Sequence, residues 1–315
     1  MNDTYLDTVR LLLSIAPDVF ATPNFAMKGG TAINLFLQNL PRLSVDIDVV
    51  YTDHVPGRDA ALNQIGEELA RAKAAIEKQG FNVKYSQTAA AGKQKGSDVK
   101  LTVFSDETSV KVEVNYVFRG TLLAPQSRQL VPAARDRFNV DFALPILHEA
   151  ELYGSKLVAA LDRQHPRDIF DVLHMYETFG LPGDFVDAFV GYVAGHDRPV
   201  HELLCAKPKS LESAHDAEFI GMTLEEVSAN TLHQIQARLH HELPRALTQQ
   251  HREFLLSLVR LAPDWDLMPY QHLKDMLAIR WKLQNLEKLR NRNSGKFDAQ
   301  EQLLKECFDA LKGGR

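Results

Sequence analysis

Apolar residues recur along the first part of the chain with two different periods. Over residues 4–16 they return every three or four positions, which predicts a helix. Over residues 44–51 they alternate with Asp46 and Asp48, which predicts a half-buried strand with both carboxylates on its polar face. The same two periods predict strands at 24–28, 81–87, 97–104 and 110–118, and helices at 31–40 and 59–79. We therefore expect residues 1–145 to form an α/β domain, a mixed sheet flanked by helices.

Only helical spacing is found from about residue 145 onward. It predicts helices at 148–162, 167–179, 185–195, 223–240, 243–260, 270–290 and 298–311. We expect a second, α-helical domain over residues 146–315, in which residues 200–315 form a helical bundle, so the fold class is α+β. Residues 89–95 are small and polar and are expected to form a mobile loop.

Composition narrows the class of protein only slightly. The formal net charge of the 315 residues is −5, so no overall cationic field attracts a nucleic acid, although a local basic stripe is enough for binding. The two cysteines, Cys205 and Cys307, cannot form a disulfide framework, and we expect them to be reduced. The N-terminus lacks a secretory signal, and no apolar run is long enough to span a bilayer. A cytoplasmic protein without membrane contact is expected.

The polar face of the strand at 44–51 is the first candidate for chemistry. Its two aspartates, at positions i and i+2, project side by side, and a divalent cation relieves their repulsion. An exposed sheet face that carries two acids explains the pattern equally well. Other features favour a metal site. Gly29 and Gly30 stand between a strand and a helix, where main-chain N–H groups can hold a triphosphate. Arg42 precedes the acid pair, and Glu113 lies on a later alternating strand.

The order of these features is typical of one superfamily. A phosphate-binding turn, a helix, an Asp-x-Asp strand and a later strand with one acid form the layout of polymerase-β-like nucleotidyltransferases. The strings MKGGTAINLF and PRLSVDIDVVY resemble the AbiEii/AbiGii branch, the toxins of bacterial toxin–antitoxin and abortive-infection systems. VKVEVNYVFRG is similar to the third-acid strand of that branch, and the K-L…R-D-x-x-D string that begins at Lys156 is similar to its helical motif.

This resemblance implies a polymerase-β-like nucleotidyltransferase sheet domain, with residues 146–180 completing the active site. It also implies a two-metal mechanism with Mg²⁺, or alternatively Mn²⁺, and a nucleoside triphosphate as substrate. The implied metal ligands are Asp46, Asp48 and Glu113. The implied catalytic residues are these three acids with Lys156 and Asp168. The implied nucleotide-binding residues are Gly29, Gly30, Thr31, Ser44, Lys156 and Asp171.

The residues of the helical motif allow more than one interpretation. Lys156 is explained either as a solvated helix lysine or as a contact to the β- and γ-phosphates of a nucleotide. Asp168 and Asp171 share one helix face, and Asp168 stands in a first turn, where a carboxylate is favourable simply as a cap. Arg163 and Arg167 are candidate ion-pair partners of these acids.

The acceptor is the part of the function that the residues indicate least. A basic stretch around Trp281 fits an RNA backbone with a stacked base, and fits equally a solvated helix end with the indole in the core. Its members are Arg280, Lys282, Lys288, Arg290, Arg292 and Lys296. The resemblance implies that a monomeric toxin transfers NMP to an RNA 3′ end, the tRNA acceptor stem, and so blocks translation. It also implies a cognate AbiEi-like antitoxin.

Three alternative functions stay open from the sequence. The acceptor could be a small molecule or a protein hydroxyl instead of RNA. The same carboxylates could serve a metal-dependent nuclease. The fold could also be a catalytically inactive binding module.

Overall fold

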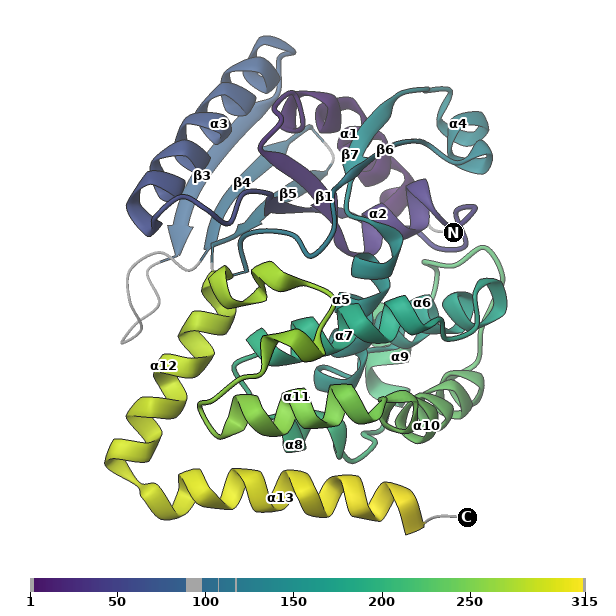
Figure 1. Cartoon of the computed structure of the whole chain (residues 1–315). Coiled ribbons are helices and arrows are strands. Elements are labelled where there is room, and N and C mark those ends of the chain that lie inside the picture. The colour runs from purple at the N-terminus through teal and green to yellow at the C-terminus, as the bar shows by residue number, and fades with distance from the viewer. Residues whose placement is uncertain (1–2, 89–97, 107, 117, 314–315) are drawn as a thin grey trace. The chain divides into compact units, whose positions relative to one another are not determined.

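The structure is a computed structural model that describes residues 3–88, 98–106, 108–116 and 118–313 (Figure 1). The loop expected at 89–95 lies outside the described residues. The chain divides into two compact units. Unit 1 consists of Met1–His148 and Ile220–Glu226, and unit 2 consists of Glu149–Phe219 and Val227–Arg315.

The described part of unit 1 is built on a seven-stranded mixed sheet with the strand order β3-β4-β5-β2-β1-β7-β6. The β2–β5 and β1–β7 pairs are parallel, and the other neighbouring strands are antiparallel. The strands are β1 Phe25–Lys28, β2 Asp46–Tyr51, β3 Asn82–Thr88, β4 Asp98–Phe104, β5 Ser109–Asn115, β6 Gln126–Gln129 and β7 Ala143–Ile146. The strands predicted before residue 120 correspond to β1 to β5, although the one predicted at 110–118 ends at Asn115, whereas β6 and β7 were not predicted.

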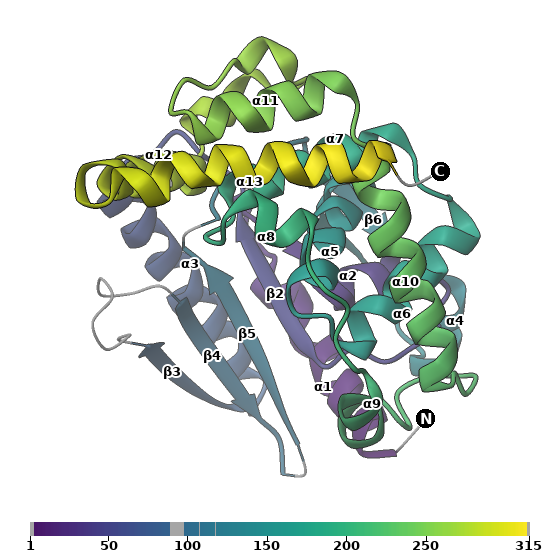
Figure 2. The ribbon, with the colours of Figure 1, turned by 90° about the horizontal axis from the view of Figure 1, so that it is seen from below.

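Where β2 pairs with β5, the two faces of this sheet differ sharply in polarity. Ile47, Val49 and Val112 are fully buried on one face, which packs against α1 (Asp3–Val19) and α3 (Arg58–Lys78) (Figure 2). The opposite face carries Asp46, Asp48, Lys111 and Glu113 and is named the acid face below. Strand alternation therefore fixes the position of the acids, because their neighbours in sequence are anchored in the core.

Two shorter helices complete the described helices of unit 1. Helix α2 (Gly29–Phe36) follows β1 directly, so the two glycines form its first turn, and it ends four residues before the predicted end. Helix α4 (Pro132–Phe138) was not predicted from the sequence, although Pro132 occupies the first helical position, where a proline is favoured.

The described part of unit 2 contains helices and no strand, as expected. Its helices are α5 Glu149–Asp162, α6 Pro166–Thr178, α7 Gly183–Gly195, α8 Val200–Leu204, α9 Glu212–Glu218, α10 Ala229–Ala246, α11 Gln249–Val259, the 3₁₀ turns η1 Trp265–Leu267 and η2 Gln271–Asp275, α12 Leu277–Arg292 and α13 Ser294–Gly313. Helices α5 and α7 approach closely because Gly154 has no side chain: a Cβ atom there would lie 2.6 Å from Cβ of Ala188. Over the described residues, no helix of either unit is both long enough and apolar enough to cross a membrane.

The predicted helix at 223–240 was wrong at its start, and the boundary after it was also misplaced. Helix α10 begins only at Ala229, because the Ser228 hydroxyl accepts the main-chain N–H of Thr231 and caps it there. Pro244 lies inside α10, and the chain breaks instead at Thr248, whose side chain caps α11. The expectation of a helix over the whole of 270–290 was wrong too, since η2 occupies its beginning.

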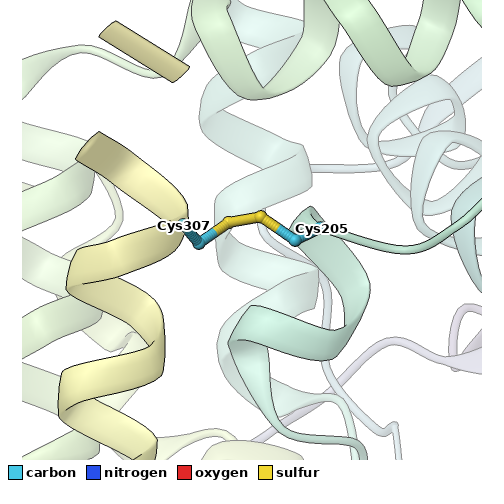
Figure 3. Close-up of a disulfide and its surroundings, with 2 residues drawn as sticks. All are labelled: Cys205 and Cys307. Carbon is cyan, nitrogen blue, oxygen red and sulfur yellow. A yellow bond between two sulfur atoms is a disulfide. The ribbon is translucent and has the colours of Figure 1, made fainter. Parts of the chain in front are cut away.

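The two cysteines are joined, contrary to the expectation that both are reduced. Cys205, at the end of α8, and Cys307, in α13, form a disulfide with their Cα atoms 6.2 Å apart (Figure 3). They are separated by 102 positions in the sequence, so only the packing of α13 against α8 within unit 2 brings them together.

Candidate active site

Asp48 and Glu113 stand in one row across the sheet of unit 1. In the strand register, Lys28 of β1 stands opposite Asp48, Asp48 opposite Glu113 of β5, and Glu113 opposite Lys100 of β4. The parallel pairing of β2 with β5, which are more than 50 residues apart in sequence, makes Asp48 and Glu113 neighbours. The amine of Lys100 lies 2.7 Å from Oε1 of Glu113, and about a third of each side chain is exposed. Cations thus already flank the acids.

The glycine turn lies directly against these acids. Gly29 has φ +78°, and a Cβ atom there would lie 2.1 Å from Oδ2 of Asp48. A Cβ atom on Gly30 would lie 2.6 Å from a terminal nitrogen of Arg42 and 3.1 Å from Oγ of Ser44. Both positions therefore need glycine, because any side chain would fill the space beside the acid, the guanidinium and the hydroxyl.

The hydroxyls of Thr31 and Ser44, both beside the acids, differ in their burial. Thr31 is fully buried; its hydroxyl donates to the main-chain oxygen of Asp46, and its Oγ1 lies 2.9 Å from Oγ of Ser44, within hydrogen-bond distance. Ser44 is half-buried and stands next to the glycine turn. Thr31 thereby ties helix α2 to the strand that carries the acids.

Residues from a distant part of the chain hold the segment that precedes the acid pair. Arg42 forms a β-bridge with Thr223; the N–H of Leu43 donates to Met222 O at 2.8 Å, and the N–H of Leu224 donates to Pro41 O at 3.0 Å. Arg42 itself is only 3% exposed. Nothing in the sequence pointed to this contact, because the two segments are about 180 positions apart and neither lies in a regular strand.

The residues of the helical motif come together within unit 2. The amine of Lys156 lies 3.0 Å from Oδ1 of Asp168 and 2.8 Å from Oδ2 of Asp171, and Arg163 also contacts Asp168, at 2.9 Å. Lys156 is only 6% exposed, so its interpretation as a solvated lysine was wrong. Arg163 is a partner of Asp168 as considered from the sequence, whereas Arg167 contacts Glu218 instead.

Charge pairing determines the protonation of Asp168. Burial alone would raise the pKa of this carboxyl, but the positive charges of Lys156 and Arg163 outweigh burial and hold its pKa below the ordinary value. The alternative that Asp168 is simply a helix cap is not supported, because His165 occupies the cap position of α6 and accepts the N–H of Arg167. Asp168 is thus a buried, charged partner of Lys156.

The basic stretch of α12 is not one continuous surface. Lys282 is 5% exposed, and its amine donates to the main-chain oxygens of His196 and Arg198. Burial lowers the pKa of Lys282 to about 8, against the opposing effect of Asp197 and Glu202. Trp281 is half-buried. The exposed members of the stretch are Arg280, Lys288, Arg290, Arg292 and Lys296.

The carboxylates of the acid face are suitable ligands for a hard divalent cation, but their side chains are not already arranged around one ion position. Asp46, Asp48 and Glu113 supply carboxylate oxygens from one face of two neighbouring strands, the ligands that Mg²⁺ takes. In the described residues, no three His, Cys, Asp or Glu side chains are arranged to hold a metal ion as they stand. The ion pair of Glu113 with Lys100 explains why these three carboxylates do not converge on one point, because it directs the Glu113 carboxylate toward the Lys100 amine.

Comparison with known proteins assigns the family. Residues 10–285 match the family described as "Nucleotidyl transferase AbiEii toxin, Type IV TA system". The chain belongs to the AbiEii family. It is therefore a nucleotidyltransferase of the toxin class. No curated protein matches the chain.

The fold of this AbiEii protein also has a relative among solved structures. MenT4, the nucleotidyltransferase toxin Rv2826c from Mycobacterium tuberculosis H37Rv, is similar with a TM-score of 0.58 and 19% sequence identity. The likeness covers 88% of this chain and 94% of MenT4. The fold class expected from the sequence, a mixed nucleotidyltransferase sheet with flanking helices followed by a helical part, is confirmed.

Proposed function

We propose that this AbiEii protein transfers NMP from an NTP to the 3′ hydroxyl of an RNA, with the tRNA acceptor stem as the target, and that this transfer blocks translation. The observation that carries the proposal is the row of Asp48 and Glu113, with Asp46 on the same face, beside a turn that excludes any side chain at Gly29. A carboxylate cluster next to a helix N-terminus suits a metal-bound triphosphate.

Asp46, Asp48 and Glu113 would hold two Mg²⁺ or Mn²⁺ ions. The ion pair between Lys100 and Glu113 would break when the ions bind. Bound there, the ions would stabilise the attacking and the leaving oxygens of an in-line displacement. Glu113 would also take the proton of the acceptor hydroxyl, once the Lys100 ion pair is released.

The glycine turn would bind the triphosphate through main-chain groups. The first N–H groups of α2, from Gly29 and Gly30, have no partner within the helix and carry the positive end of its dipole. The Ser44 hydroxyl stands beside Gly30 and would donate to a phosphate oxygen. Thr31 would act indirectly, by fixing Ser44 and the main chain of Asp46.

We assign to Lys156 the neutralisation of charge on the pyrophosphate leaving group. Its buried position between Asp168 and Asp171 supports a role beyond solvation, because the two carboxylates hold the amine in a fixed position. Asp168 and Asp171 would then act through Lys156, and Asp171 would orient it toward the nucleotide.

The decisive experiment incubates the purified protein with each labelled NTP and total RNA, with Mg²⁺ or with a chelator. Label is expected on RNA that gains length, and not on RNA whose 3′ hydroxyls have been destroyed by periodate. Asp48→Asn should abolish labelling, while Asp59→Asn, at a carboxylate that is 92% exposed on α3, should leave it unchanged. A co-encoded AbiEi-like antitoxin is the expected partner.

Other outcomes would point to the alternatives. Label on a small molecule or a protein, but not on RNA, would show that this molecule is the acceptor instead of RNA. Shortened RNA would indicate a nuclease, and the absence of both labelling and Mg²⁺-nucleotide binding would indicate an inactive binding module.

A further inference from the structure

The acid face continues beyond the acids onto the outer strands of the sheet. Asp46 stands opposite Lys111 on β5, Lys111 opposite Thr102 on β4, and Thr102 opposite Lys84 on β3. Neighbouring strands are roughly 5 Å apart, so this row extends roughly 15 Å outward from Asp46. Side chains along the row all point to the same side of the sheet as the acids.

This outer part of the acid face is positively charged, although the chain as a whole carries a net charge of −5. Among the acid-face residues of β3, β4 and β5 whose side chains the structure describes, the charged ones are Lys84, Lys100, Lys111 and Glu113. Because Lys100 and Glu113 pair with each other, the excess positive charge lies on Lys84 and Lys111, and both are exposed. Such a local excess attracts a polyanion.

An aromatic ring lies among these lysines. Phe104, at the end of β4, is half-buried on the acid face, and the amine of Lys84 lies 5.0 Å from the centre of its ring. An exposed cation–π contact stabilises by about 0.5–1 kcal/mol, whereas a nucleobase stacked on an aromatic ring contributes about 1–3 kcal/mol. A base can therefore displace the amine of Lys84, whose flexible stem lets it move to a neighbouring phosphate.

We propose that Lys84, Phe104 and Lys111, named the lysine–phenylalanine surface, bind the single-stranded end of the acceptor RNA. A strand that crosses this surface toward β2 meets Lys84 and Phe104 first and Lys111 last, and its terminal hydroxyl reaches Asp46 and Asp48. The inference rests on the proposed function in one respect, that the acceptor is RNA. It adds which residues recognise the acceptor.

The first test compares two double variants that remove the same charge. Lys84→Met/Lys111→Met changes the surface, and Arg10→Met/Lys78→Met changes one exposed residue on each of α1 and α3, the helices that pack on the other face of the sheet. The dissociation constant of a short single-stranded RNA is measured by fluorescence anisotropy over a range of salt concentrations. The first variant should bind more weakly, and its log–log salt slope should fall by about 1.4 relative to wild type, since each lost phosphate contact removes about 0.7. The control variant should match wild type.

The second test isolates the aromatic ring. Phe104→Leu should weaken RNA binding about fivefold or more through lost stacking, with the salt slope unchanged. Its KM for RNA should rise in the same proportion, and its KM for NTP should stay at the wild-type value, because the glycine turn is untouched. Circular dichroism and thermal unfolding verify that each variant is folded.

The outcomes separate this inference from the proposed function. If wild type extends RNA but the surface variants bind and extend it as wild type does, the surface is wrong and the function stands. If wild type neither binds nor extends RNA, both fail together. Equal competition by polyglutamate and by RNA of matched charge would also overturn the inference, because it would indicate an acidic protein as the occupant.

Discussion

Gly29 lies so close to Asp48 that a single added methyl group would lie 2.1 Å from the Oδ2 atom of the carboxylate. The turn that would bind phosphate and the strand that would bind metal are therefore in direct contact. One carbon atom at position 29 is enough to disturb both, and this closeness leads to the first prediction.

Gly29→Ala should reduce nucleotidyl transfer by at least about a hundredfold, because the methyl group must displace Asp48 and because φ +78° is unfavourable for alanine. The expected loss of stability is about 1–3 kcal/mol. Gly66→Ala is the matched control: it lies inside α3 with nothing within 4 Å of an added Cβ, and should be neutral or stabilising. Wild-type activity in Gly29→Ala would show that the glycine turn is not part of the active site.

Lys100 and a divalent cation compete for Glu113. Lys100→Met should therefore lower the Mg²⁺ concentration needed for half-maximal transfer, by about fivefold at most, since a pair that is one-third exposed stabilises by only about 1 kcal/mol. Glu113→Gln should raise that concentration. The measurement is a Mg²⁺ titration of activity, supported by calorimetric binding of Mn²⁺. A higher Mg²⁺ requirement in Lys100→Met would instead assign Lys100 to positioning Glu113.

Lys156 is enclosed by two buried carboxylates, so its removal should be costly even without substrate. Lys156→Met leaves the charge of Asp171 buried without this amine, and we expect a loss of about 3–5 kcal/mol in the free energy of unfolding, measured in urea. Lys73→Met, which breaks the exposed pair with Glu77, should cost less than about 1 kcal/mol. Similar losses for both variants would contradict the buried pairing.

The Cys205–Cys307 disulfide closes a loop of 102 residues within unit 2. In the chain-entropy description, a cross-link of this span stabilises by roughly 4–5 kcal/mol. Thiol reductant should therefore lower the unfolding temperature of wild type and leave the Cys205→Ser/Cys307→Ser variant unaffected. Equal reductant effects on both proteins would show that the disulfide does not form in solution, as would two reactive thiols in the untreated protein.

Burial of Lys282 predicts a dependence of stability on alkaline pH. Burial lowers its pKa in the folded state to about 8 from the ordinary value of 10.5, so the unfolded chain binds more protons between these values. The cost of burying the charged amine is full below pH 8 and is removed as the pH rises to 10.5. Relative to Lys282→Met, wild type should gain stability across this window, as measured by denaturant unfolding. Lys288→Met, an exposed change on the same helix, should show the pH dependence of wild type.

The sequence by itself determined the elements and much of the chemistry. Alternation over 44–51 placed Asp46 and Asp48 on one face of a strand, and helical spacing separated a sheet part from a helical part. These features are local: side-chain direction follows from the backbone period, so neighbours in the chain are enough to read them. The same local pattern identified the family, which the comparisons confirm.

Only the tertiary structure decided which distant groups meet. The order of strands put Glu113 beside Asp48 and Lys100 beside Glu113, and packing buried Lys156 between Asp168 and Asp171. Packing also joined Cys205 to Cys307. These contacts link positions that are 12 to 102 residues apart, as the ion pairs and the disulfide show. No local period encodes such pairs, because strand order and helix packing are set by the burial of the whole core.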